Sequence, residues 1–210
     1  MPVRKRDSDV TRAQILEVAR ELFVSAGHEA VTVREVARRV GISHGTIYLY
    51  YRDKDDLLLQ VCEEQFAKLL TSLRRLPRTR TPRERLRDAL ALLAAFGIDN
   101  PHEYYLMMGI HATVAQRATQ ADWGPMAERV SNHIQDLVSA VVGEVVTGGE
   151  KARRVAWALA ASVTGLIMFC HADNVEREAA RLLTELQLDM LFDGLQSAVK
   201  LAQVPVEELT

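Results

Sequence analysis

The feature that most constrains the fold is a pair of short helical segments joined at Gly41, within residues 32–51. Thr32 and Glu35 have the spacing of a capping box, in which the threonine hydroxyl accepts from the glutamate N–H and the glutamate reaches back. Gly41 ends this first helix because glycine adopts a left-handed conformation at little cost. Ser43 is suited to cap a second short helix. The segment therefore predicts a helix-turn-helix unit.

Helical periodicity predicts that the rest of the chain is helical too. Glycine and proline are sparse, at 11 and 6 of 210 residues, and apolar residues recur at the 3, 4, 7 spacing of one helical face. Beyond a first helix from Asp9 or Thr11 to Gly27, the expected helices cover residues 32–40, 43–51, 53–76, 83–98, 101–118, 126–146, 150–171 and 175–201. We therefore predict an all-α fold of about nine helices. A DNA-reading head over residues 1–54 is expected to join, through a long helix, a body over residues 55–210.

The helix-turn-helix has the residue types that its geometry requires. Ala37 is small where the two helices cross, and Val36, Ile42 and Ile47 form an apolar wedge that fixes their angle. The second helix can then enter a major groove with its N-terminal residues foremost. Residues 1–54 carry 10 Lys/Arg and 7 Asp/Glu, in a chain of net charge −2. This basic excess fits a reading head but is weak for a sequence-nonspecific architectural DNA binder, which is one alternative.

The stretch TVREVARRVGISHGTIYLYYRDKDDL, residues 32–57, resembles the signature of TetR/AcrR-family transcriptional regulators. The resemblance covers about residues 10–60. Tyr51 stands where phenylalanine is usual and Asp53 replaces a commoner serine, while His44 and Leu49 occupy variable positions that help to set operator choice. The resemblance implies DNA contacts, to phosphates or to groove edges, by Thr32, Arg34, Ser43, His44, Gly45, Thr46, Tyr48, Tyr50 and Lys54.

The resemblance also implies a homodimeric repressor that binds a short palindromic operator and is released by a small, hydrophobic effector. Pairing is expected through the last two helices, whose apolar stripes are broader than one domain needs. The alternative is an unusually broad intramolecular core. Effector-lining residues are expected in the middle helices, although such residues are more often core: Leu93, Phe96, Tyr104, Met107, Met108, His111 and Trp157.

An all-α enzyme, metal-dependent or not, is a competing class that the motifs disfavour. His102-Glu103 begins like the HExxH zinc motif, but Leu106 stands where the second histidine is required. No catalytic residue, metal site or cofactor is therefore predicted. Cys62 and Cys170 are expected as small buried residues. The apolar run at residues 155–170 is shorter than the roughly 20 residues of a membrane span, so we predict a buried core helix and a cytoplasmic protein.

Overall fold

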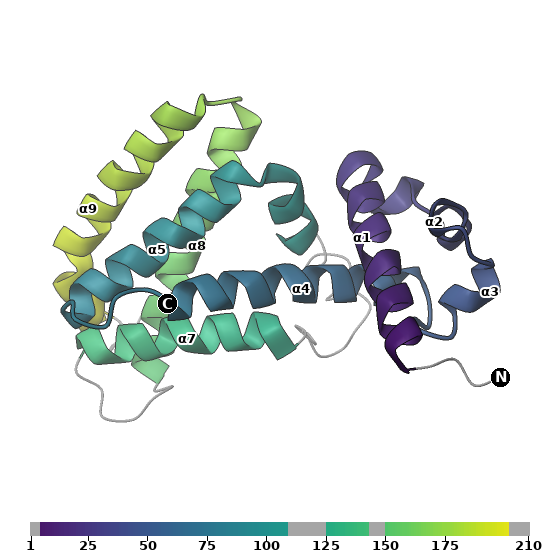
Figure 1. Ribbon diagram of the computed structural model, residues 1–210. Coiled ribbons are helices and arrows are strands. Elements are labelled where there is room, and N and C mark those ends of the chain that lie inside the picture. Colours follow the sequence, from purple (N-terminus) through teal and green to yellow (C-terminus); the bar gives the residue numbers. More distant parts are fainter. Residues whose placement is uncertain (1–4, 109–124, 143–149, 202–210) are drawn as a thin grey trace, which may run out of the picture. The chain divides into compact units, whose positions relative to one another are not determined.

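The structure, a computed structural model, describes residues 5–108, 125–142 and 150–201. Within these ranges the chain forms helices and turns and no strand, which confirms the predicted all-α fold (Figure 1). The predicted loop at residues 119–125 lies almost wholly outside them, as do Gly148, Gly149 and the tail after Val204.

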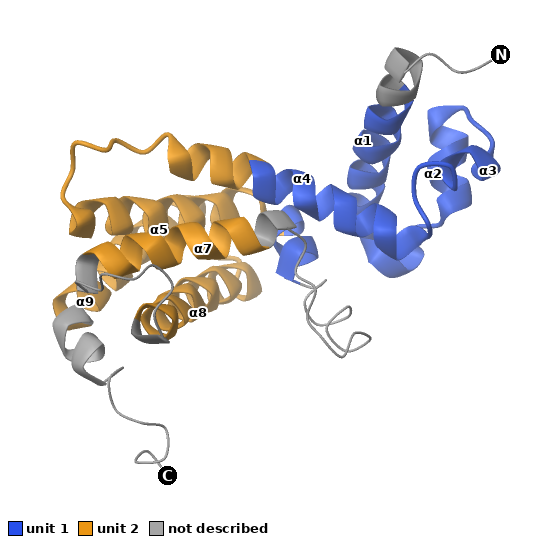
Figure 2. Cartoon of the chain, turned by 90° about the horizontal axis from the view of Figure 1, so that it is seen from below, with its two compact units in different colours: residues 1–67, 102–126 blue, residues 68–101, 127–210 orange. Residues whose placement is uncertain are grey.

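The chain divides into two compact units (Figure 2). Unit 1 comprises residues 1–67 and 102–126, and unit 2 comprises residues 68–101 and 127–210. The first part of the long helix α4, Lys54–Arg74, and the helical residues 102–108 thus group with the N-terminal helices. A boundary at residue 54 does not anticipate this grouping.

Unit 1 is built on α1 (Lys5–Ala30), α2 (Val33–Val40), α3 (His44–Ile47) and the start of α4. The helix α1 contacts α2, and α2 contacts α3. The apolar face predicted for the first helix is turned inward. The core includes Ile15, Leu16, Ala19, Leu22, Phe23, Val36, Ala37, Ile47, Tyr51, Leu57, Leu58 and Val61.

The first helix differs from the prediction at both ends. It begins at Lys5, ahead of the caps expected at Asp9 or Thr11. Gly27 interrupts the helix with φ 77°, as its predicted role as a helix end requires, but helical structure resumes and continues to Ala30. The sequence therefore located the break correctly and missed the short extension beyond it.

Unit 2 is built on α5 (Pro82–Asp99), α7 (Pro125–Val142), α8 (Glu150–Ala172) and α9 (Arg177–Leu201). These bounds agree with the predicted segments to within a few residues. Helix α5 contacts both α8 and α9, which also contact each other, so these three helices enclose much of the unit's core. Leu86, Ala89, Leu90 and Ala94 of α5 are completely buried in it.

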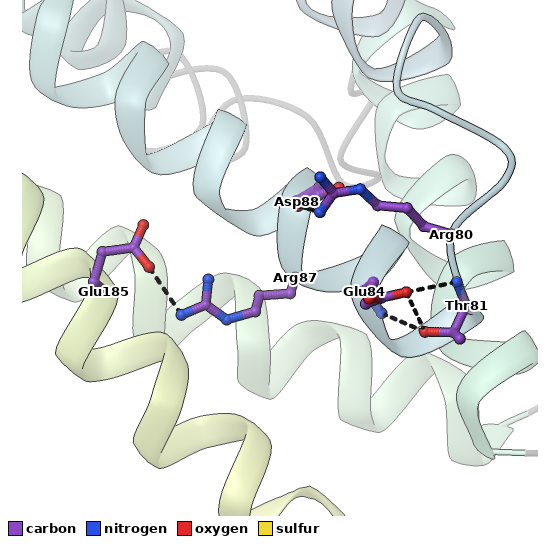
Figure 3. A network of polar contacts seen from close by, with 6 residues as sticks. All are labelled: Arg80, Thr81, Glu84, Arg87, Asp88 and Glu185. Carbon is purple, nitrogen blue, oxygen red and sulfur yellow. Dashed lines mark hydrogen bonds and ion pairs between the residues drawn. The ribbon is translucent and has the colours of Figure 1, made fainter.

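The start of α5 is fixed by local and long-range polar contacts (Figure 3). Thr81 and Glu84 form a full capping box, in which the Thr81 N–H donates to Glu84 at 2.8 Å and the Glu84 N–H donates to Thr81 at 3.3 Å. One turn further on, the Arg87 guanidinium donates to Glu185 at 2.8 Å and to Asp189 at 2.6 Å. These ion pairs join α5 to α9 inside unit 2.

Helices α5 and α8 approach closely at Gly97. A Cβ atom at this position would lie 2.7 Å from Cδ1 and 2.9 Å from Cγ2 of Ile167, closer than packed carbon atoms can approach. Ile167 is almost completely buried and has little room to move. The Gly97 carbonyl is also 3.1 Å from Nε2 of His171, on the same helix as Ile167. The absence of a side chain at residue 97 therefore sets the spacing of these two helices.

Helix α8 is buried on one face only, so the prediction of a buried core helix is half right. Residues Ala152–Ala172 are long and apolar enough to cross a membrane by composition, with a mean hydropathy of 1.7. Only 33% of this window is buried inside the chain, although core helices of soluble proteins pass the same test. Both cysteines are buried as predicted, and burial raises the pKa of the Cys62 thiol to about 12.

We expect Gly97→Ala to lower the free energy of unfolding by about 1–3 kcal/mol, because the added methyl group overpacks the contact with Ile167. The measurement is thermal or urea denaturation followed by circular dichroism. The matched control is Gly97→Ala combined with Ile167→Val, which removes the nearest carbon and should recover part of the loss. Equal stability of the wild type and Gly97→Ala would show that the two helices are not held at this spacing.

Candidate nucleic-acid interface

Helix α2 begins and ends as the sequence predicts. Thr32 caps its N-terminus by accepting a 3.2 Å hydrogen bond from the Glu35 N–H. Gly41 ends it with φ 79°, and the N–H groups of Gly41 and Ile42 donate to carbonyls of the last turn. The reciprocal half of the predicted capping box is replaced, because the Glu35 carboxylate accepts from Arg38 at 2.6 Å. This hydrogen bond lowers the pKa of Glu35.

The angle between α2 and α3 is set by a small buried cluster. Val36 and Ala37 from α2 meet Ile47 from α3 in the core, as the wedge requires, while Ile42 in the turn is only half-buried. Tyr51 is also buried, and its hydroxyl donates to the Arg12 carbonyl at 3.5 Å. Burial raises the pKa of this phenol, so Tyr51 is a neutral core side chain.

The reading helix is shorter than predicted. Helix α3 covers only His44–Ile47, with Ser43 as its cap, and Tyr48 to Tyr50 form a turn. The backbone tightens here because the N–H groups of Leu49 and Tyr50 donate to carbonyls three residues back, at 3.2 and 2.9 Å. The sequence predicted an α-helix through Tyr51. In the structure the α-helix ends at Ile47, and the hydrogen bonds between residues three apart form a tighter turn after it.

The start of α4 is bonded to the C-terminal end of α1, which is a second contact that stabilises the helix-turn-helix unit. The Asp53 side chain accepts from the Asp56 N–H at 2.8 Å, the predicted cap. The Lys54 ammonium group donates to the His28 carbonyl at 2.8 Å, and His28 Nε2 lies 2.9 Å from Asp55 Oδ1. Lys54 was predicted only as a phosphate contact. In the structure it also binds the C-terminal end of α1.

The predicted DNA-contacting residues come together in unit 1, on α2, α3 and the start of α4. Tyr48 is 52% exposed and is not a core aromatic residue. Its ring lies edge-on to that of His44, with 6.4 Å between centroids. Thr32, Arg34, Ser43, His44, Gly45 and Tyr48 are exposed, whereas Thr46, Tyr50 and Lys54 are half-buried.

The predicted effector residues are divided between the two units. Tyr104 and Met107 are buried in unit 1 with Met108 half-buried, while His111 lies outside the described residues. In unit 2, Leu93 and Phe96 are half-buried on α5, but Trp157 is 59% exposed on α8. Trp157 therefore lies on an outer face of that unit, with the Arg153 guanidinium 5.2 Å from its ring centroid.

One ion pair that no sequence motif indicates joins α1 to residues 102–108 inside unit 1. The Arg20 guanidinium donates to Glu103 at 3.2 Å and to Glu17 on its own helix. Both side chains of the longer-range pair are largely shielded from solvent. Charge patterning along one helix predicts the Glu17 contact, but nothing in the sequence links residues 20 and 103.

Across the described ranges, no cluster of three or more His, Cys, Asp or Glu could hold a metal ion.

Comparisons with known proteins agree with this geometry. Residues 15–61 match the family described as bacterial regulatory proteins, tetR family. The chain is 30% identical over 132 residues to the HTH-type transcriptional activator FasR of Mycolicibacterium smegmatis, covering 62% of this chain and 60% of that protein. It is 29% identical over 97 residues to an HTH-type transcriptional regulator of Staphylococcus aureus, covering 46% of this chain and 52% of that protein. The matches thus span little more than half the length of these curated relatives.

Solved structures show the same fold over most of the chain. FadR from Bacillus subtilis, in complex with stearoyl-CoA, superposes with a TM-score of 0.63 at 17% identity, covering 87% of this chain and 98% of that one. A transcriptional regulator from Rhodococcus sp. Rha1 has a TM-score of 0.67 at 23% identity, covering 87% and 96%.

The head and these similarities define the fold and the helix-turn-helix class of its N-terminal unit. Over residues 15–61 the chain is therefore similar to TetR-family regulators, as the sequence resemblance indicated. The curated relatives that it matches are transcriptional regulators.

We expect Gly41→Ala to destabilise unit 1 by about 1–2 kcal/mol, since alanine pays a steric penalty at φ 79°. Nothing lies within 4 Å of a Cβ atom placed there, so the backbone conformation alone is responsible. Gly41→Asn is the control, because asparagine tolerates this conformation better. Thermal denaturation should rank the variants wild type, Asn, Ala; an Ala variant as stable as the wild type would contradict the left-handed turn.

Proposed function

We propose that the chain is a homodimeric repressor that binds a short palindromic operator through the exposed residues of the α2–α3 head. The observation that carries the proposal is the separation of roles in this head. Val36, Ala37 and Ile47 are buried in the wedge, whereas His44, the first residue of the reading helix, and Tyr48, directly after its last residue, are exposed. Such a wedge presents the N-terminal residues of the second helix to a major groove.

The side chains expected to contact DNA fit two kinds of contact. Tyr48 carries a hydroxyl group that can donate to a phosphate, and Lys54 has two N–H groups left beyond its bond to His28. His44 and Arg34 can reach base edges, and Gly45 lets the backbone come close to them. Phosphate contacts would position the head, and base contacts would select the sequence.

Pairing through α8 and α9 is supported by an apolar surface on unit 2. The α9 residues Leu182, Leu186 and Met190 are 64%, 60% and 75% exposed and follow one another at four-residue intervals, so they form one row. On α8, Trp157 and Phe169 are also exposed. A monomer rarely leaves such a surface in water. Two copies related by a twofold axis would cover it, and would present two reading heads to a palindrome.

The effector is proposed to be a small hydrophobic molecule. Half-buried apolar side chains remain on α5 within unit 2, among them Leu93 and Phe96. Pockets in helical proteins are lined mostly by such side chains. The FadR structure with the same fold holds stearoyl-CoA, a ligand with a long apolar chain. A ligand of this apolar class is the first probe to test, and localisation is proposed to be cytoplasmic, where the operator is.

A second candidate function, transcriptional activation, is favoured by one observation. The relative at 30% identity is an activator. The head serves either role, because repression and activation differ in where the operator lies relative to the promoter. Footprinting on the regulated promoter distinguishes them: overlap with the polymerase site supports repression, and an upstream site supports activation.

We expect Tyr48→Phe to weaken binding to every duplex by about tenfold per half-site, because each half-site loses a hydrogen bond to a charged phosphate. His44→Ala should instead change the preferred base at one position of each half-site. Fluorescence anisotropy with selected and scrambled duplexes measures both effects. Tyr105→Phe, at an exposed tyrosine outside the helix-turn-helix, is the control.

Wild-type affinity and preference in both variants would contradict this map of the interface. Binding that depends on salt but not on sequence would favour the architectural alternative. Adding stearoyl-CoA to the same assay tests the effector class. Release of the duplex supports a repressor that its effector releases from DNA, and tighter binding of the duplex contradicts release by the effector.

We expect Leu186→Lys to convert the dimer into a monomer, because one buried charge in each copy faces the apolar surface of the other. Sedimentation velocity measures the change. Thr79→Lys, at an exposed position between α4 and α5, adds the same charge away from the row and should leave the dimer intact. A monomeric wild type, or a Leu186→Lys variant that still pairs, would exclude this face.

A further inference from the structure

Leu49 is the most exposed of the large apolar side chains in the described ranges, at 81%. Most others that are strongly exposed lie on α8 and α9, where pairing of two copies accounts for them. Leu49 instead lies in unit 1, in the turn that follows the reading helix. A single exposed leucine is unremarkable on most surfaces. Leu49, however, lies on the surface proposed to bind DNA, where a base of the DNA can contact its side chain.

The backbone fixes where Leu49 stands. Its N–H donates to the Thr46 carbonyl at 3.2 Å, and the Tyr51 N–H donates to the Ile47 carbonyl at 3.0 Å. Since Ile47 and Tyr51 are buried, the turn between them is anchored at both ends. The leucine side chain is therefore presented outward from a rigid segment.

The residue one turn before Leu49 leaves room for a close approach. Gly45 precedes it by four residues, a spacing that places two residues on the same side of a helical turn. A Cβ atom at Gly45 would meet nothing closer than the Ser43 hydroxyl, at 3.7 Å. A base pair can thus approach the backbone at Gly45 and come within reach of Leu49.

The hydroxyl groups beside this gap are already engaged with each other. The Ser43 and Thr46 hydroxyls lie 2.8 Å apart, and Ser43 also accepts from the Thr46 N–H at 3.1 Å. Their capacity to read base edges is correspondingly reduced. The Leu49 side chain can therefore recognise a base at this part of the surface through an apolar contact.

We propose that Leu49 packs against the C5-methyl group of a thymine in each half-site and so selects thymine at that position. The thymine methyl is the one apolar group on a base edge in the major groove, and it distinguishes thymine from every other base. This inference rests on the proposed DNA-binding function and deepens it. The resemblance places Leu49 at a position that influences operator choice, and the inference adds which base it selects and by which contact. Burial of one methyl group corresponds to about a fourfold change in affinity for each half-site.

The test removes the methyl group from the DNA and the side chain from the protein separately. Each thymine of a selected palindrome is replaced in turn by deoxyuridine in both half-sites, and affinities are measured by fluorescence anisotropy. For the wild type, one replacement should weaken binding about fourfold per half-site. Leu49→Ala should bind the thymine and uracil duplexes equally well at that position.

Tyr48→Phe is the matched control, because it should weaken all duplexes and keep the uracil penalty. Melting temperature checks that Leu49→Ala is folded, as expected for a side chain without buried contacts. The inference is overturned if no uracil replacement weakens the wild type, or if Leu49→Ala keeps the same penalty. A wild type that binds no sequence specifically would instead refute the proposed function, and the inference with it.

Discussion

The helix-turn-helix head depends on a contact between very few apolar side chains of α2 and α3. Helix α3 has four residues, too few to be stable alone, because helix nucleation costs more than one turn returns. Ile47 anchors it against Val36 and Ala37, and Tyr51 anchors the turn that follows. The caps at the starts of both helices and the left-handed conformation of Gly41 then fix the backbone conformation between them. Every exposed group of the interface takes its position from this contact.

Features that arise within a few residues were predictable from the sequence. The caps at Thr32, Ser43 and Asp53 and the turn at Gly41 appear where their residue types indicate, because each is a local exchange of hydrogen bonds. Features that join distant residues were not. The Arg20–Glu103 ion pair and the closeness of Gly97 to Ile167 depend on which helices become neighbours, and no spacing along the chain encodes that.

Helix α8 shows a second limit of sequence patterns. An apolar residue reads the same whether it is to be covered by its own chain or by another molecule. The run that includes Val155 and Ile167 is buried within unit 2, but Trp157 and Phe169, with the same apolar character, are exposed. Periodicity predicted the helix and its bounds well. Only the packing of α5 and α9 against it shows which face the single chain leaves uncovered.

The exposure of His44, Gly45 and Leu49 has a consequence for how such regulators diverge. None of the three lies in the buried cluster that holds the head together, and exposed positions of this kind usually change stability by only a few tenths of a kcal/mol when substituted. Mutation can therefore alter these residues after a gene duplication without first unfolding the protein. Under the proposed function, a duplicated copy can thus acquire a new set of target genes while keeping the same scaffold.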